Sequence, residues 1–211
     1  AMRPSARAAV PSALRDTAVD IALVSRPLRP DEARGLRVAR YAVTEVVLAA
    51  NAGIGAERLT RTELVEVLRG ERRRWRDGSA LSFIAREAGD SSHRALAEAV
   101  PGFAEAERNA LRERRFRVVY SDDDLRDALV ETPGGLGVTD RGGVAMHRRV
   151  LAQVPLLPRA PITKDLAFVY APDARPEVHA FVAFALSEAG RGVVREGRTR
   201  GEQRGQQGHR G

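Results

Sequence analysis

The chain has 211 residues and no cysteine, so it has room for one sizeable domain or two small lobes, and a disulfide framework or a thiolate metal site is excluded. Hydrophobic residues make up 43% of the chain, which is enough to bury a core and excludes wholesale disorder. The formal net charge of +7 and the pI of about 10.9 favour an anionic partner, which would be an oxyanion, a nucleic acid or an anionic lipid surface. Because no run of 18 apolar residues occurs, we expect no transmembrane helix.

The first quarter of the chain alternates helix and strand patterns. A weak helix is expected over residues 5–18. The apolar, β-branched run VDIALVS at 19–25 has the length of a strand, and residues 37–51 form the longest strand-like segment. Between them we expect a turn at 26–30 and a short helix ending near Gly35.

The segment LTRTELVEVLRGERRRWRDG at 59–78 contains the clearest helix signal. Thr60 and Glu63 have the spacing of a capping box, in which the hydroxyl and the carboxylate each bind a backbone N–H at the helix start. An apolar stripe on this helix is expected to be buried: Leu64, Val65, Val67 and Leu68. The helix then leads into a basic turn, ERRRWR at 71–76, which carries the only tryptophan.

Strand and helix patterns continue to alternate along the rest of the chain. Strands are expected at 81–85, 116–120 and 162–170, and after a Gly-rich turn at 133–139. Helices are expected at 89–100, 104–114, 121–132 and 175–195, the last burying Val178, Phe181, Val182, Phe184 and Ala185. The Arg- and Gly-rich tail at 198–211 is expected to be disordered. This alternation predicts an α/β fold with mixed, mostly parallel sheets flanked by helices.

Several motifs follow one another in a characteristic order: VDIALVSRPL at 19–28, VVLAAN at 46–51, the 59–78 segment, REAGDSS at 86–92, TPGGLG at 132–137 and the closing stretch 162–197. In this order they resemble the type 2 periplasmic-binding-protein fold, specifically the phosphate-type substrate-binding proteins of ABC transporters. The resemblance implies two lobes that close around an oxyanion and deliver it to a membrane permease. Lobe one would be 1–44 plus 155–197 and lobe two 45–154, with hinge crossings near Thr44–Val47 and Leu156–Thr163.

The same resemblance implies a ligand site. Arg86, Ser91 and Ser92 occupy the place of the family's anion loop, and an arginine there offers a planar fork to an oxyanion while the serines add donors at a helix start. Ser25 and Arg26 follow a buried strand, and α/β proteins tend to place ligands at the carboxyl ends of strands. We therefore predict these five residues as ligand contacts.

Each of these candidates also has a purely structural interpretation. Asp90 stands where the family usually has a serine, so its carboxylate competes with a phosphate for the helix N–H groups and is well suited to cap the helix and pair with Arg86. Arg26 would then be a solvated residue of the turn before Pro27. Ser25 replaces the carboxylate of many phosphate binders, and the family's first, glycine-rich anion loop is not found.

Other motifs are interpreted as structural. The run ERRRWR would suit phosphates, with Trp75 as a stacking surface, but a solvated basic turn with a packed tryptophan is favoured. The acidic run 122–124 is interpreted as a helix cap and not as a metal site, because it lacks the alternating spacing of a calcium loop. His93 is expected on the surface, and the histidines show no metal or triad spacing, so neither a metal nor a cofactor is predicted.

The combined prediction is a solute-binding protein, without catalysis, that captures a small phosphate-like oxyanion for an ABC transporter. Its partners would be that anion and an ABC permease, and its location the periplasm or the cell exterior, although the sequence shows no signal-peptide apolar region. Two alternatives stay open: a degenerate module of this fold with an interaction, sensory or structural role, and a nucleic-acid-associated basic protein, for which the charge alone is no firm support. Nothing in the sequence sets an oligomeric state.

Overall fold

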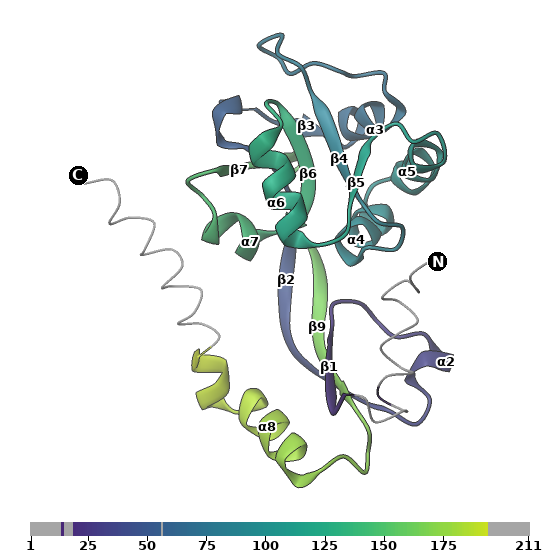
Figure 1. The fold of residues 1–211 in the computed structure, drawn as a ribbon, viewed down its shortest axis with the longest axis vertical. Helices are drawn as coiled ribbons and strands as arrows, with labels where there is room; N and C mark the ends of the chain where they lie inside the picture. The colour runs from purple at the N-terminus through teal and green to yellow at the C-terminus, as the bar shows by residue number, and fades with distance from the viewer. Residues whose placement is uncertain (1–13, 15–18, 56, 194–211) are drawn as a thin grey trace, which may run out of the picture. The chain divides into compact units, whose positions relative to one another are not determined.

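The computed structural model describes residues 14, 19–55 and 57–193, which form two compact units (Figure 1). In this part of the chain, unit 1 runs to Thr44 and resumes at Lys164, and unit 2 is Glu45–Thr163. The predicted tail at 198–211 and, apart from Leu14, the predicted helix at 5–18 lie outside the described residues. The chain leaves unit 2 after Thr163, whereas the sequence placed the return to lobe one at 155.

A small second sheet explains why residues 155–163 belong to unit 2. β3 (Leu59–Thr60) pairs in parallel with β8 (Leu156–Leu157), and the Leu59 backbone N–H donates to the Pro155 carbonyl at 3.0 Å. Leu59 and Ile162 are both buried in the same hydrophobic cluster. Strands of two residues are too short to show a periodic pattern, so the sequence did not predict them.

The core of unit 2 is a mixed sheet with the strand order β2–β6–β4–β5, to which β7 adds on the other edge of β2. Its strands are β2 (Arg37–Asn51), β4 (Ser82–Arg86), β5 (Arg117–Val119), β6 (Gly135–Asp140) and β7 (Leu151–Val154). β4 runs parallel to β5 and β6, whereas β2 runs antiparallel to β6 and β7. The α/β fold with mixed sheets is confirmed, and within this sheet parallel pairing is confined to β4 and its neighbours.

Helices cover both faces of this sheet (Figure 1). On one face lie α3 (Arg61–Arg69), α4 (Ser91–Ala99) and α5 (Phe103–Arg112), and on the other α6 (Asp122–Glu131) and α7 (Arg141–Met146). Successive residues of β2 point to opposite faces, so Val46 and Leu48 pack in the first cluster while Val47 and Ala49 pack in the second. This two-sided burial accounts for the continuous apolar run that identified the strand.

Helix α3 forms as its sequence predicts. The Thr60 hydroxyl accepts the Glu63 backbone N–H at 3.1 Å, and the Glu63 carboxylate accepts the Thr60 backbone N–H at 2.7 Å, which completes the capping box. The helix ends at Gly70, whose φ of 74° is in the left-handed region that favours glycine. All four residues of the predicted stripe are buried: Leu64, Val65, Val67 and Leu68.

Unit 1 contains β1 (Ile21–Val24), α2 (Pro30–Ala33) and α8 (Pro176–Leu186). It also contains β2 up to Thr44 and β9 (Ile162–Tyr170) from Lys164 onward. β1 runs antiparallel to β9, and the small core consists of Phe168, Tyr170, Val178 and Val182. The predicted burial of Phe181 and Phe184 is wrong, because these side chains are 50% and 53% exposed. Almost every position of α8 is apolar, so periodicity does not select its buried face.

Neither α8 nor any other helix in the described part of the chain combines the length and the apolarity that a bilayer span requires.

Candidate functional site

Arg86 is the last residue of β4, directly before the loop that leads into α4. Its side chain is 7% exposed, because β4 lies between β5 and β6 in the interior of the sheet. The guanidinium therefore lies at the carboxyl end of a parallel strand and ahead of a helix N-terminus. This is a place where α/β folds commonly bind ligand groups.

The Arg86 guanidinium is surrounded by three carboxylates of its own chain. Nε donates to Glu87 Oε2 at 3.0 Å, Nη1 donates to Asp122 Oδ1 at 2.5 Å, and Nη2 lies 3.7 Å from Asp90 Oδ2. A longer hydrogen bond of 3.5 Å runs from Nη2 to the Tyr120 carbonyl. Burial by itself lowers the pKa of Arg86, but the hydrogen bond to Glu87 and the nearby carboxylate charges outweigh burial and raise that pKa.

Asp90 also occupies the start of helix α4. Its Oδ1 accepts the backbone N–H groups of Ser92 at 2.9 Å and His93 at 3.0 Å, which is the geometry of an N-cap. Ser91 and Ser92 form the first turn, and Ser92 is buried. The structure thus brings Arg86, Ser91 and Ser92 together around a carboxylate that already binds two of the helix N–H groups.

Ser25 and Arg26 belong to unit 1 and form a separate arrangement. Arg26 is not a solvated turn residue: Nη1 and Nη2 make a bidentate pair with the Glu32 carboxylate at 2.7 and 2.9 Å. Glu32 also accepts the Arg29 backbone N–H at 2.9 Å, so the pair fixes the turn that opens α2. The Arg26 hydrogen bonds are the main reason that the pKa of Glu32 falls from 4.5 to about 2.

The lowered pKa of Glu32 predicts a pH-dependent loss of stability. A carboxyl with a depressed folded-state pKa stabilises the fold above its unfolded-state value of 4.5, and this stabilisation disappears as the pH falls toward about 2. We expect Glu32→Gln to lower the free energy of unfolding by about 1–2 kcal/mol at pH 6, after an allowance for solvent screening, with no difference near pH 2. Urea unfolding at a series of pH values measures this difference.

A surface ion pair of the same unit provides the matched control. Arg40 and Asp165 lie 3.0 Å apart with side chains 59% and 46% exposed, so Asp165→Asn should change stability by less than about 0.5 kcal/mol. Equal effects of the two substitutions at all pH values would contradict the special role of Glu32.

His93 of α4 and Glu107 of α5 form a largely buried pair that the sequence did not predict. His93 is 1% exposed, and its Nδ1 contacts the Glu107 carboxylate of α5, while its ring lies against Phe83 and Phe103. The expectation of a surface histidine is therefore wrong. Three residues after the cap, the helix turns this side chain inward, and an isolated histidine carries no sequence signal for burial.

Trp75 is packed and the acidic run 122–124 opens a helix, as their structural interpretations predict. Trp75 is 3% exposed, and its indole Nε1–H donates to the Gly134 carbonyl at 3.0 Å, so the ring is packed and does not offer a stacking surface. The acidic run 122–124 begins α6, where Ser121 is the N-cap, although Asp122 additionally reaches Arg86. In the described residues, no three His, Asp or Glu side chains gather as metal ligands.

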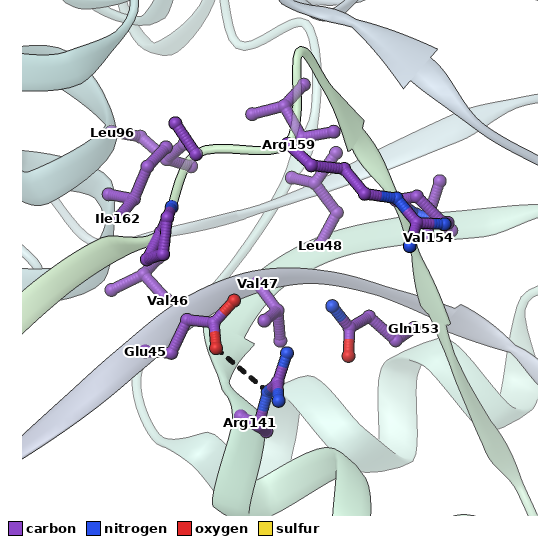
Figure 2. Close-up of a pocket in the computed structure, with 14 residues that line it drawn as sticks. Glu45, Val46, Val47, Leu48, Leu96, Arg141, Gln153, Val154, Arg159 and Ile162 are labelled. Carbon is purple, nitrogen blue, oxygen red and sulfur yellow. Dashed lines mark ion pairs between the residues drawn. The ribbon is translucent and has the colours of Figure 1, made fainter.

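A pocket of about 620 Å³ lies elsewhere in unit 2 (Figure 2). Figure 2 shows the ion pair between Arg141 Nε and Glu45 Oε2, 2.9 Å long, on one side, and Gln153 beside it. Buried side chains such as Val46 and Leu48 form its apolar wall. None of the five predicted residues lines this pocket, and the ion pair neutralises two of its three charged residues, which leaves Arg159.

The chain is similar to a known protein family and to several solved structures. Residues 6–189 match a family model described as PBP superfamily domain, whereas no curated protein matches the chain. A structure assigned as a phosphate ABC transporter substrate-binding protein from Clostridium perfringens, with bound phosphate, has a TM-score of 0.72 at 15% identity over 89% of this chain and 81% of that one.

Two further solved structures show how widely this fold is used. An ABC-type phosphate transport receptor from Vibrio cholerae has a TM-score of 0.61 at 18% identity, with 93% of this chain and 86% of that one covered. The CcmR regulatory domain from Synechocystis PCC6803 in complex with 2-PG has a TM-score of 0.54 at 15% identity, with 84% and 76% covered. At such identities the likeness shows the fold and not the ligand.

Proposed function

This chain belongs to the PBP superfamily, and we propose that it is a solute-binding protein that captures a small, phosphate-like oxyanion. The Arg86 guanidinium is the proposed anchor, with Ser91 and Ser92 at the start of α4 as neighbouring donors. Ser25 and Arg26 remain proposed contacts from unit 1, although the bond between Arg26 and Glu32 favours a structural role for Arg26.

The observation that supports this proposal most is the buried guanidinium of Arg86 at the end of β4. An arginine presents several N–H donors in a fixed plane, which suits a tetrahedral oxyanion, and burial strengthens such a contact. Asp122 is the carboxylate that an entering anion can displace, because its side chain is 73% exposed and belongs to the adjacent helix α6. Asp90, which caps α4 and is nearly buried, stays in place and weakens the binding.

The partner and the location are proposed by analogy. Two of the similar structures carry names of phosphate transport proteins, and on this basis we propose an ABC permease as partner and the periplasm or the cell exterior as location. The sequence similarity is too low to transfer the ligand, so the anion is defined here by its size and charge.

A second function, a sensory or interaction module without a transported anion, is favoured by the carboxylates around Arg86. Three carboxylates face one guanidinium, so an anion entering this place meets net negative charge. A regulatory domain is among the structures with the same fold. Asp90 is the residue that distinguishes the two functions, because it binds the helix N–H groups that an oxyanion would use.

Calorimetric titration with phosphate, sulfate and molybdate tests the proposal. The variants are Asp90→Ser, which keeps a good N-cap but removes the charge, and Arg86→Lys, which keeps the charge but removes the planar fork. Asp140→Ser is the matched control, because Asp140 caps α7 through the Gly143 backbone N–H at 2.9 Å in the same unit.

We expect weak binding of one oxyanion by the wild type, about tenfold tighter binding in Asp90→Ser and a clear loss in Arg86→Lys, with Asp140→Ser unchanged. Binding only in Asp90→Ser would favour the sensory or interaction module. Absence of binding in the wild type and in Asp90→Ser would contradict the oxyanion site at Arg86.

A further inference from the structure

Two arginine-rich segments that are distant in the sequence meet at one end of unit 2. Residues 69–76 contain five arginines, and residues 112–117 contain four. They meet at Gly70, where a Cβ atom would lie 3.2 Å from Cδ of Arg115 and 3.7 Å from Nη2 of Arg73. The packing of α3 against α5, the helices that lead into the two segments, produces this meeting.

A pocket of about 580 Å³ opens where the segments meet. Four arginines line it together with hydroxyl and aromatic side chains, among them Arg72, Arg73, Arg115, Arg117, Ser82 and Phe116. The residues that line it include no Asp or Glu. Its volume is within the range of small-molecule sites, roughly 300–1,000 Å³.

The arginines of this pocket keep donor groups that no protein acceptor uses. Arg73 donates only through Nε, to the Gly70 carbonyl at 2.7 Å, and Arg117 only through Nη1, to Glu131 at 3.3 Å. The buried Nε of Arg72 has no hydrogen-bond partner. In the described part of the chain, the other N–H groups of Arg73 and Arg117 also lack an acceptor, which an anionic ligand would supply.

This pocket is separate from the Arg86 site. Ser82 begins β4 and Arg117 begins β5, whereas Arg86 ends β4, so the two sites lie at opposite ends of a strand about 13 Å long. The carboxylates of Asp90 and Asp122 gather at the Arg86 end, and the guanidinium groups gather at this one.

We propose that this basic pocket binds a compact ligand with two or more adjoining phosphate groups. Arg72, Arg115 and Arg117 each pair with a glutamate outside the lining. Among the described residues, this leaves the unpaired charge of Arg73 and the unused N–H donors of this pocket for a ligand. These donors are spread around the hollow, and a di- or triphosphate chain provides several adjoining anionic acceptors for them. The hollow shape, with walls from the turn after α3 and from the first residues of β4 and β5, favours a compact ligand over an extended nucleic-acid strand or a flat lipid surface.

The test is calorimetric titration of the full chain with sodium tripolyphosphate at about 50 mM and about 300 mM salt. The variant Arg73→Ala/Arg117→Ala removes two exposed lining side chains, and circular dichroism checks that its fold is kept. The matched control is Arg148→Ala/Arg149→Ala, which removes the same charge outside the pocket. Orthophosphate titration of Arg86→Lys is run in parallel, so that failure at either site is recognised independently of the other.

We expect tripolyphosphate to bind the wild type, the control double variant to bind within about twofold, and Arg73→Ala/Arg117→Ala to bind at least about tenfold more weakly. Arg86→Lys should leave this affinity unchanged. Absence of binding, or an equal loss in the two double variants, would overturn the proposal. It would also be overturned if duplex DNA or phosphatidylglycerol vesicles bound through Arg73 and Arg117 more tightly than tripolyphosphate, since the pocket would then serve a macromolecule or a membrane.

Discussion

Replacing Arg86 with alanine is expected to lower the free energy of unfolding of unit 2 by about 3–5 kcal/mol at neutral pH. The substitution removes a buried cation and leaves Glu87, Asp90 and Asp122 near one another without the cation that they share. Asp90 cannot move to solvent without releasing the N-terminus of α4, so part of this repulsion persists in the folded state. Urea unfolding followed by the fluorescence of Trp75, the only tryptophan and a buried one, measures the loss in this unit.

The Arg86→Ala penalty should depend on pH in a direction that follows from linkage. Without the guanidinium, the three carboxylates repel one another as anions in the folded protein, so acid that neutralises their charge reduces the penalty. Arg126→Ala is the control, because Arg126 makes ion pairs of 2.6 and 2.9 Å with exposed Asp123 and Asp127, and solvent screening makes its expected effect on stability much smaller than that of Arg86→Ala. A pH-independent Arg86→Ala penalty would show that lost packing, and not carboxylate repulsion, is responsible.

The sequence predicts the long elements of this fold well, because their signals are local. The limits of β2 and β9 match the predicted strands at 37–51 and 162–170, and the capping box of α3 forms as expected. The short elements β3, β7, β8 and α7 were not predicted, because strands of two to four residues and a single helical turn or two depend on the partners that the fold supplies. Parallel or antiparallel pairing is likewise set by topology and not by local pattern.

The candidate site was predictable only in part. Sequence reasoning identified Arg86 and recognised Asp90 as a cap and a competitor, since both lie in one short motif. It did not find Asp122 as a third partner, because that contact joins residues 36 positions apart through the pairing of β4 with β5. The basic pocket was missed for the same reason: each arginine run looks like a solvated turn until α3 and α5 pack together.

The two sites of unit 2 lie at opposite ends of β4 and differ in the charge around them. The carboxyl end of the strand combines one guanidinium with three carboxylates, whereas four guanidinium groups line the pocket at the amino end and three of them pair with glutamates outside the lining. The overall charge of +7 therefore does not describe the surface that a ligand meets. Anions are attracted more strongly to the amino end, so a binding experiment with phosphate compounds must assign each signal to one end by substitution.

Replacing Gly134 with alanine is expected to destabilise unit 2 by about 4 kcal/mol or more. Its φ of 72° is left-handed, and an added Cβ would lie 1.9 Å from the Ala80 carbonyl oxygen and 3.2 Å from Trp75 Nε1. The Gly134 carbonyl accepts both that indole N–H and, at 3.2 Å, the Ser82 backbone N–H at the start of β4. A backbone shift at Gly134 that relieves the clash therefore breaks the hydrogen bonds of its carbonyl with Trp75 and Ser82. Because Trp75 loses this packing, its fluorescence emission should move to longer wavelength in the folded protein.

Gly78→Ala separates the clash from the backbone strain. Gly78 has a φ of 87° in the loop after α3, but a Cβ atom there meets nothing within 4 Å, so the substitution carries only the cost of the left-handed conformation, about 1–2 kcal/mol. The difference in free energy of unfolding between the two variants measures the cost of disturbing the close approach of residues 80 and 134, where the loop after α3 contacts the turn before β6. If both alanine variants had the same stability and the same tryptophan emission, this approach would not contribute to the fold, and the TPGG turn would owe its glycine to conformation alone.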